Sequence, residues 1–464
     1  MNTSISTAAL QSAHAERAAN DIAAHLHPFT NLAAHPQVDP LVMERGDGIY
    51  VEDDQGRRYL EAMSGLWCVS LGFSNARLAK AGSDALHTLP CYHTFNHRSN
   101  AAAIALAEKL LSMAPVPMSK VFFANSGSEA NDTAVKLVWY YHNAIGKPGK
   151  KKIIARRNAY HGVTVAAASL SGLVPNHRDF DLPIDRVLHV DCPHHYRYAE
   201  PGETEEAFAT RLADALEQRI LAEGPDTVGA FIAEPVMGAG GVLVPPATYF
   251  EKVQAVLRKY EVLLIADEVI CGFCRTGEMF GSTTFGLRPD ILTAAKALSS
   301  GYVPISAVMV SEQVHAAVAA NSGKIGTFGH GFTYSGHPVT AAVALETLRI
   351  YEDEQMLAHV QAVAPQFQAG LRRYADHPHV GEVRGVGLIG ALELAADPAK
   401  RMPFDAAMKA GARLAELALQ EGLIVRAMGD AVAFCPPLII TPAQIDEMFE
   451  RFDRAMVRFE ASLA

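Results

Sequence analysis

An apolar run followed by two acids and, further on, by a lone lysine constrains this chain more than any other feature. The run covers residues 262–266 (Val-Leu-Leu-Ile-Ala), and Asp267 and Glu268 follow it directly. A short run without polar alternation is typical of a parallel strand that is covered on both faces. Ligands bind at the carboxyl ends of such strands in open α/β sheets. The stretch therefore predicts an α/β fold with a ligand site beside Asp267.

Lys296 is the lone lysine, and it lies among small apolar residues in Thr-Ala-Ala-Lys-Ala-Leu. Desolvation disfavours a charged amine, so such surroundings lower the pKa of a lysine and make it a usable nucleophile. A lysine of this kind with an acid such as Asp267 suggests pyridoxal phosphate (PLP) chemistry, in which the lysine forms a Schiff base and the carboxylate holds the pyridine nitrogen protonated. On these two residues alone, a structural ion pair is an equal alternative.

Three motifs surround these residues: Leu-Ile-Ala-Asp-Glu-Val-Ile-Cys-Gly-Phe at 264–273, Arg-Thr-Gly at 275–277 and Ala-Ala-Lys-Ala-Leu at 294–298. They closely resemble the class III (subgroup II, omega) aminotransferases, and the resemblance runs from about Phe29 to the C-terminus. It implies PLP fold type I, the aspartate-aminotransferase-like α/β fold. In that fold a large domain with a mostly parallel seven-stranded sheet is joined to a small α+β domain, and two subunits form a dimer with shared active sites.

The expected division of the chain follows from the same resemblance. Residues 71–337 form the large PLP-binding domain, residues 338–464 form the C-terminal small domain, and the N-terminal segment of residues 1–70 contributes to the small domain. Local patterns add detail: a hairpin turns at Asp54-Gln55-Gly56, a strand covers residues 383–393, and a capping box at Thr441 begins a helix.

A strand, a small-residue loop and a helix start follow one another between residues 121 and 141. The loop reads Asn-Ser-Gly-Ser-Glu-Ala-Asn, and free N–H groups at such a junction attract an anion. Ser128 is also a candidate N-cap. The resemblance implies Gly127 and Ser128 as phosphate contacts. The later motif His-Gly-Phe-Thr-Tyr-Ser-Gly-His-Pro implies that Thr333 reaches the phosphate of the neighbouring subunit, although a hydroxyl between glycines is otherwise usually a turn residue.

Three further residues are expected to contact the cofactor. Tyr160 opens a Tyr-His-Gly motif similar to the family's residue that stacks on the pyridine ring, and a core tyrosine is the alternative. Glu234 follows an apolar run and is another acid at a strand end, and Val269 follows the acid pair. The resemblance implies that Asp267 stabilises the positive pyridine nitrogen. It also implies that Lys296 binds the cofactor and moves the proton between the substrate and cofactor carbons.

The residues expected to line the substrate pocket are Phe29, Trp67, Phe95, Tyr160 and Arg426. Trp67 lies in Ser-Gly-Leu-Trp-Cys, which matches the amine transaminases, whereas composition alone favours a core tryptophan. Arg426 lies at a predicted strand end, where its guanidinium could hold a carboxylate, and a surface arginine is the alternative. Alanine occupies position 239. The ornithine and γ-aminobutyrate branches of the family have a glutamate there that pairs with a substrate-reading arginine, so the sequence disfavours those two activities.

Composition narrows the function classes. The formal net charge of −10, from 40 basic and 50 acidic side chains, gives no electrostatic footprint for nucleic acid. The six cysteines show no disulfide framework, and the pair Cys271 and Cys274 has no second pair, so a zinc or redox site at these two thiols is not expected. No signal-peptide pattern and no apolar run of membrane-spanning length is present, so we expect a cytoplasmic protein.

The resemblance implies a PLP-dependent omega-transaminase of the amine:pyruvate type. It would move an amino group from an amine or omega-amino donor to a keto acid, pyruvate above all, by a ping-pong mechanism. A racemase or aminomutase and a dialkylglycine-type decarboxylase of the same family are alternatives that share the cofactor. A non-catalytic PLP-binding regulator would need no lysine nucleophile, so Lys296 argues against it. We expect a homodimer, or a tetramer built from it, with small-molecule substrates.

Overall fold

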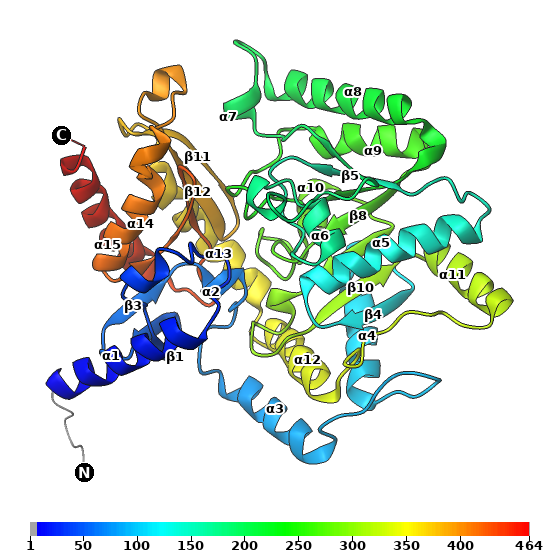
Figure 1. Cartoon of the computed structure of the whole chain (residues 1–464), viewed down its shortest axis with the longest axis horizontal. Helices are drawn as coiled ribbons and strands as arrows, with labels where there is room; N and C mark the ends of the chain where they lie inside the picture. Colours follow the sequence, from blue (N-terminus) through cyan, green and yellow to red (C-terminus); the bar gives the residue numbers. More distant parts are fainter. Residues whose placement is uncertain (1–6, 464) are drawn as a thin grey trace.

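The computed structural model describes residues 7–463, in which two groups of elements lie side by side (Figure 1). On the right of Figure 1 is a large sheet flanked by helices. On the left, helix α1 (Thr7–Ala24) and the strands after it lie beside elements from the last quarter of the chain, including helix α15 (Pro442–Ala461). Within residues 7–463, no helix combines the length and the apolar character needed to cross a membrane.

The large sheet has seven strands in the order β4-β10-β9-β8-β7-β5-β6. β10 runs antiparallel to its neighbours β4 and β9, and the other pairs are parallel. The predicted α/β architecture with a mostly parallel seven-stranded sheet is therefore confirmed. The strands are β4 (Lys120–Ala124), β5 (Lys152–Arg156), β6 (Val187–Val190), β7 (Val228–Ala233), β8 (Leu263–Asp267), β9 (Ile291–Ala294) and β10 (Ser306–Val310).

Alternate residues of the central strand β8 pack on opposite faces of the sheet. Leu263 and Ile265 join an apolar cluster with helices α5 (Gly127–Ala144), α6 (Val165–Leu170) and α11 (Glu312–Ile325). Leu264 and Ala266 join a second cluster with helices α8 (Glu205–Glu223) and α9 (Tyr249–Lys259). Burial on both faces explains the unbroken apolar run in the sequence. Because side chains alternate along a strand, Asp267 lies on the face that α5 covers.

Three helices pack beside strands β4, β10 and β9 of the sheet: α3 (Ala76–Thr88), α4 (Ala101–Met113) and α12 (Pro338–Asp353). Asn75 and Asn100 begin α3 and α4 as N-caps, because each side chain accepts hydrogen bonds from backbone N–H groups in the first turn. Leu292 and Met309 of the sheet share an apolar cluster with residues of α4 and α12. Helices α4 and α12 therefore cover one face of the sheet at β4, β10 and β9.

Two four-stranded sheets form the other group of elements. One has the order β1-β2-β3-β13 and the other β11-β12-β15-β14. β13 pairs in parallel with β3, so the last part of the chain extends a sheet built by the N-terminal part. Their strands are β1 (Met43–Asp47), β2 (Tyr50–Asp53), β3 (Arg58–Glu61), β11 (Val380–Val386), β12 (Ile389–Leu394), β13 (Leu423–Ile424), β14 (Arg426–Met428) and β15 (Ala431–Phe434).

The turns between these strands agree with those expected from the sequence except at one place. The hairpin of β2 and β3 is confirmed, and Gly56 in its turn has a φ of 78°, which favours glycine. The expected single strand over residues 383–393 is wrong, because β11 and β12 form an antiparallel hairpin there. Gly387, with a φ of 56°, makes its turn. The apolar alternation continues on both sides of the turn, so the pattern alone did not reveal the reversal.

Helices α13 (Met356–Arg372), α14 (Ala410–Gln420) and α15 pack with these sheets. The predicted capping box is present at the start of α15, where Thr441 and Gln444 exchange hydrogen bonds between side chain and backbone. The remaining elements are the short helices α2 (Ser64–Trp67), α7 (His195–Tyr198) and α10 (Gly281–Phe285), and 3₁₀ turns at His35–Gln37, Val174–Asn176, Pro225–Thr227, Lys296–Leu298, Pro398–Lys400 and Ala406–Met408.

Candidate active site

A cavity of about 120 Å³ lies at the carboxyl ends of β7 and β8 and beside the start of α5. It is the position that open α/β sheets give to ligands. All of the residues predicted to contact the cofactor line it except Thr333. Its wall is made of Gly127, Ser128, Asn131, Tyr160, His161, Gly162, Glu234, Asp267, Val269, Ile270 and Lys296.

Asp267 is held by one side chain from α5 and one from the segment between β5 and α6. Its Oδ2 accepts from Nδ2 of Asn131 at 2.8 Å and lies 2.7 Å from Nδ1 of His161, and its Oδ1 accepts from the backbone N–H of Val269 at 3.1 Å. Asn131 is fixed in turn by Thr293, whose Oγ1 donates to Asn131 Oδ1 at 3.0 Å. Asp267 is 3% exposed and lines the cavity, and these hydrogen bonds hold its carboxylate in one orientation.

Lys296 lines the same cavity, at the start of the 3₁₀ turn that follows β9. Its backbone has a φ of 48°, a conformation that costs a residue other than glycine about 1–3 kcal/mol and is typical of functional sites. Burial lowers the pKa of its amine, and the carboxylate of Asp267 opposes this shift. Within residues 7–463 the amine forms no ion pair. The alternative expectation, a structural ion pair between Lys296 and Asp267, is therefore not observed within residues 7–463.

The first turn of α5 provides the anion site. Ser126, not Ser128, is the N-cap, because its Oγ accepts from the backbone N–H of Glu129 at 3.1 Å. Gly127 and Ser128 follow it, so their N–H groups belong to the unpaired donors that begin every helix. Gly162 closes against this turn, since an added Cβ would lie 2.4 Å from Ser128 Oγ. Any other residue at position 162 would push Ser128 away from its position in the cavity wall.

Glu234 and Tyr160 form the wall at the end of β7. Glu234 is buried, and burial raises the pKa of its carboxyl group. Its oxygens accept from the backbone N–H groups of Tyr160 and Gly238, both at 3.0 Å. The carboxylate thereby holds Tyr160 at the edge of the cavity, so this ring is not a core tyrosine.

Trp67 and Arg426 lie next to the cavity without lining it. Trp67 is 3% exposed and packs in an apolar cluster with Ile270, which does line the cavity. Arg426 begins β14, and Met428, on the same face of that strand, packs against the same cluster. Burial lowers the pKa of the Arg426 guanidinium, and the neighbouring Tyr160 opposes this shift. In the described part of the chain Arg426 has no ion-pair partner.

Phe29, Phe95 and Thr333 do not line the cavity of this single chain. Phe29 is 72% exposed and Phe95 is 42% exposed. Phe95 and the loop of Thr333 lie side by side, because Thr94 Oγ1 donates to the carbonyl of Ser335 at 3.1 Å and a Cβ on Gly331 would lie 2.9 Å from the Phe95 ring. The expected roles of these three residues therefore stay predictions.

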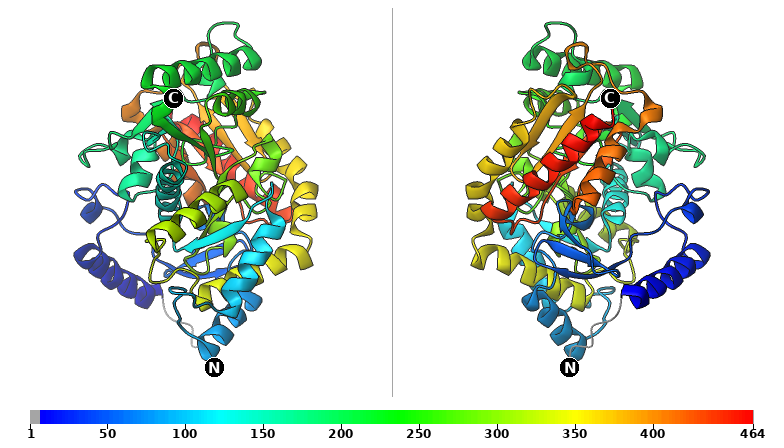
Figure 2. Two further views of the ribbon diagram at one scale, coloured as in Figure 1. Left: turned by 90° about the vertical axis from the view of Figure 1, so that its right-hand side faces the viewer. Right: turned by 90° about the vertical axis from the view of Figure 1, so that its left-hand side faces the viewer.

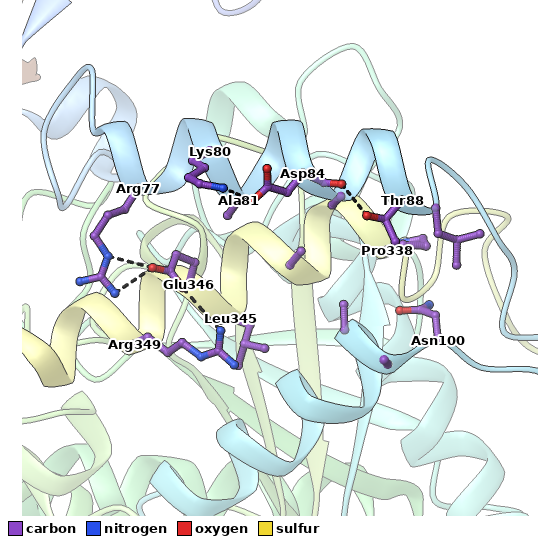
Figure 3. Close-up of a pocket in the computed structure, with 15 residues that line it drawn as sticks. Arg77, Lys80, Ala81, Asp84, Thr88, Asn100, Pro338, Leu345, Glu346 and Arg349 are labelled. Carbon is purple, nitrogen blue, oxygen red and sulfur yellow. Dashed lines mark hydrogen bonds and ion pairs between the residues drawn. The ribbon is translucent and has the colours of Figure 1, made fainter.

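A larger cavity lies elsewhere. It measures about 520 Å³ and lies among α3, α4 and α12 (Figure 3). Its charged side chains pair with one another: Arg77 Nε donates to Glu346 at 2.8 Å, and Lys80 pairs with Asp84 (Figure 3). It offers no buried nucleophile, so we assign the chemistry to the smaller cavity.

Sequence reasoning missed two residues that touch Asp267, namely Asn131 and His161. Both lie in motifs that the sequence analysis used only to place neighbouring residues: Asn131 ends the loop motif of Gly127 and Ser128, and His161 is in the Tyr-His-Gly motif of Tyr160. Asn131 lies four residues after Gly127 and therefore on the same helix face, so this spacing could have predicted that Asn131 faces the cofactor site. His161 follows Tyr160, but nothing local indicates that its ring reaches a carboxylate 106 positions away.

Comparison with known proteins decides the family. The family model described as aminotransferase class-III matches residues 32–456. The chain belongs to this family. Among solved structures it resembles the omega transaminase from Pseudomonas jessenii in complex with PMP, with a TM-score of 0.94 and 57% identity over 95% of this chain and 97% of that one. It also resembles a structure described as a transaminase with L-ala, with a TM-score of 0.90 and 59% identity over 91% of this chain and 100% of that one.

Curated relatives of this class III aminotransferase include gamma-aminobutyrate transaminase 1, mitochondrial, from Oryza sativa subsp. indica. The two are 52% identical over 440 residues, which is 95% of this chain and 85% of the relative. The chain is therefore an aminotransferase that uses PLP and acts on an amine and a keto acid. Its relatives are transaminases, which does not favour the racemase alternative.

The cavity fits PLP in each of its parts. The free N–H groups of Gly127 and Ser128 would hold the phosphate, the buried Asp267 would hold the proton on the ring nitrogen, and the Lys296 amine would bind the aldehyde carbon. Once bound, PLP supplies an electron sink for the carbanion formed at the substrate carbon. Asn131 and His161 keep Asp267 oriented, and the lowered pKa of Lys296 gives an amine that can carry a proton between two carbons.

Proposed function

We propose that this aminotransferase takes its amino group from an amine that lacks an α-carboxylate and passes it to pyruvate. Arg426 carries the proposal. It is half-buried, it neighbours Tyr160 of the cavity, and it has no ion-pair partner within residues 7–463. A desolvated guanidinium is costly without an anion, and it binds a carboxylate bidentately when one is present. The carboxylate of a keto acid would supply the missing partner.

The other half of the site suits an amine without a charge beside the reacting carbon. Trp67 and Ile270 form an apolar cluster against the cavity, and the ring of Tyr160 lines it. In the expected scheme, Arg426 turns toward the cavity for the acid and away from it for the amine. Alanine at position 239 leaves no carboxylate there to hold the guanidinium in one place.

γ-Aminobutyrate is a second candidate donor. The sequence disfavours it because of Ala239, yet relatives named gamma-aminobutyrate transaminases are 52% identical to this chain. This donor has no α-carboxylate, so its reacting carbon is that of an ordinary primary amine. Its distant carboxylate could pair with Arg426. Such an enzyme would use Arg426 in both half-reactions.

We also propose that the enzyme is a homodimer whose two active sites are shared. Phe29, Phe95 and Thr333 are expected at the active site, yet in one chain Phe29 and Phe95 are exposed and none of the three lines the cavity. A partner that covers these residues would bring them to its own cavity by two-fold symmetry. The neighbouring positions of Phe95 and the Thr333 loop support this arrangement, since one contact surface would include both.

The test uses the two half-reactions separately. Purified enzyme loaded with PLP is mixed with one donor at a time: 1-phenylethylamine, a diamine, γ-aminobutyrate or L-alanine. Conversion of the bound cofactor to its amine form is followed by absorption, and pyruvate or 2-oxoglutarate is then added to reverse it. We expect fast conversion by a carboxylate-free amine and fast reversal by pyruvate. No conversion by any amine that lacks an α-carboxylate would contradict the proposal.

A further inference from the structure

Four side chains that commonly bind metals meet where α1 ends, away from the active-site cavity. Asp21 in α1, His25 just after the helix and His27 place one ligand atom each within 4.8 Å of one another. His35, the first residue of the 3₁₀ turn His35–Gln37, places its Nε2 3.5 Å from Asp21 Oδ2. Figure 2 shows α1 and the segment after it on the outside of the molecule.

The spacing of these atoms suits a small divalent ion. His27 Nε2 lies 2.7 Å from Asp21 Oδ2, and His25 Nδ1 lies 3.2 Å from Asp21 Oδ1. A tetrahedral Zn²⁺ ion has bonds of about 2.0–2.1 Å to nitrogen and oxygen, which places its ligand atoms about 3.3 Å apart. The measured distances lie on both sides of that value. The ligand atoms of Asp21, His25 and His27 lie within 4.8 Å of one another, and His35 approaches the same carboxylate, so rotation of these side chains would bring them onto one ion.

The local backbone brings the four residues together. The N–H of His25 donates to the carbonyl of Asp21 at 2.9 Å, so these two residues lie one helical turn apart on one face. The chain then reverses at Asn31, whose carbonyl accepts from the N–H of His35 at 3.0 Å. As a result the rings of His27 and His35 lie 4.2 Å apart between centroids.

Hydrogen bonding alone leaves this cluster incomplete. Three imidazoles face the single carboxylate of Asp21. The His35 side chain is 11% exposed, and its buried Nε2 has no hydrogen-bond partner among the described residues. His14, on the same helix, shows the contrast, because both of its ring nitrogens lie 2.8 Å from a carboxylate oxygen, one of Asp54 and one of Asp39. His14 is a satisfied structural histidine, whereas the cluster has an unpaired nitrogen directed at its centre.

We propose that Asp21, His25, His27 and His35 bind one Zn²⁺ ion in a tetrahedral site of three nitrogens and one oxygen. Four protein ligands leave no open position, which is the mark of a structural site and not of a catalytic one. The ion ties the end of α1 to the turn that ends at His35. Phe29, which is 72% exposed, lies between His27 and His35, so the ion also fixes the loop that carries it.

The test measures zinc binding by the enzyme itself. Tag-free protein with saturating PLP is freed of metals with a chelator, dialysed and titrated with Zn²⁺, and bound zinc is counted by mass spectrometry. We expect one zinc ion per chain. His27→Gln and His35→Gln should each weaken binding by more than about 100-fold, since even the loss of an outer partner of a metal ligand costs 10- to 100-fold. Circular dichroism checks that each variant is folded.

His87→Gln is the matched control, because His87 is exposed and bonds only the carbonyl of Ser83 in its own helix. This variant should bind zinc as the wild type does. A second readout is limited proteolysis, in which zinc should slow cleavage within residues 25–37 of the wild type and of His87→Gln only. The proposal is overturned if the wild type shows no saturable zinc binding or if His27→Gln binds zinc equally well. Unchanged affinity in His35→Gln overturns the four-ligand site.

Discussion

Replacement of Arg426 by alanine is the sharpest test of how one pocket serves two substrates. The guanidinium is half-buried beside Tyr160, has no ion-pair partner in residues 7–463, and has a pKa lowered chiefly by burial. In the free enzyme it is therefore an uncompensated, partly desolvated charge. Its removal should affect the acid substrate strongly and the folded state hardly at all.

The magnitude follows from what the substrate carboxylate would lose. Removing one partner of a desolvated, hydrogen-bonded charge pair costs about 2–4 kcal/mol, which corresponds to a decrease of about 30- to 1000-fold in kcat/KM. We expect this decrease for pyruvate and for alanine. A carboxylate-free amine such as 1-phenylethylamine makes no such pair and should change by less than about threefold. The melting temperature should stay the same or rise, because no structural ion pair is broken.

Single-turnover absorption measurements with each substrate give the two values separately, and a thermal melt of the same samples gives the stability. Arg349→Ala is the matched control, since Arg349 lies in the distant cavity near Glu346, 3.6 Å away, and should change neither half-reaction (Figure 3). An equal loss of both substrate classes in Arg426→Ala, or a clear drop in its melting temperature, would refute the scheme and make Arg426 a structural residue.

Further outcomes are expected for four variants and for dilution of the enzyme. Lys296→Ala should lose turnover together with the absorption of lysine-bound cofactor, and a variant that keeps both would contradict its role as nucleophile. Asp267→Asn should lose about 100-fold or more in rate with PLP still bound, because an amide cannot stabilise the positive ring nitrogen. Asn131→Ala should lose only about tenfold, because Asp267 keeps its charge and is only less well oriented. Equal rates in wild type and Asp267→Asn at full cofactor loading would exclude the role given to Asp267. Dilution to monomers should release PLP and abolish activity together. Thr333→Ala should lower the fraction of enzyme that holds PLP at equilibrium. Full activity in a demonstrated monomer would show that the site is not shared.

The sequence by itself determined the secondary structure around the site and the chemical identity of its main groups. The apolar run before Asp267 is a strand buried on both faces, and local composition suffices to predict that. Lys296 among small apolar residues is half-buried and its pKa is lowered by burial, as its neighbours indicated. The order of several motifs was sufficient for the family, which the match over residues 32–456 confirms.

Tertiary structure alone decided which groups meet. Periodicity describes a residue relative to its neighbours in one element, so it could not reveal that α5 and β8 aim Asn131 and Asp267 at the same point. It could not distinguish the strand expected at 383–393 from the hairpin of β11 and β12, because apolar alternation looks the same on both sides of a turn. The histidines after α1 show the same limit: each is unremarkable in sequence, and only the reversal of the chain at Asn31 brings His35 back to Asp21.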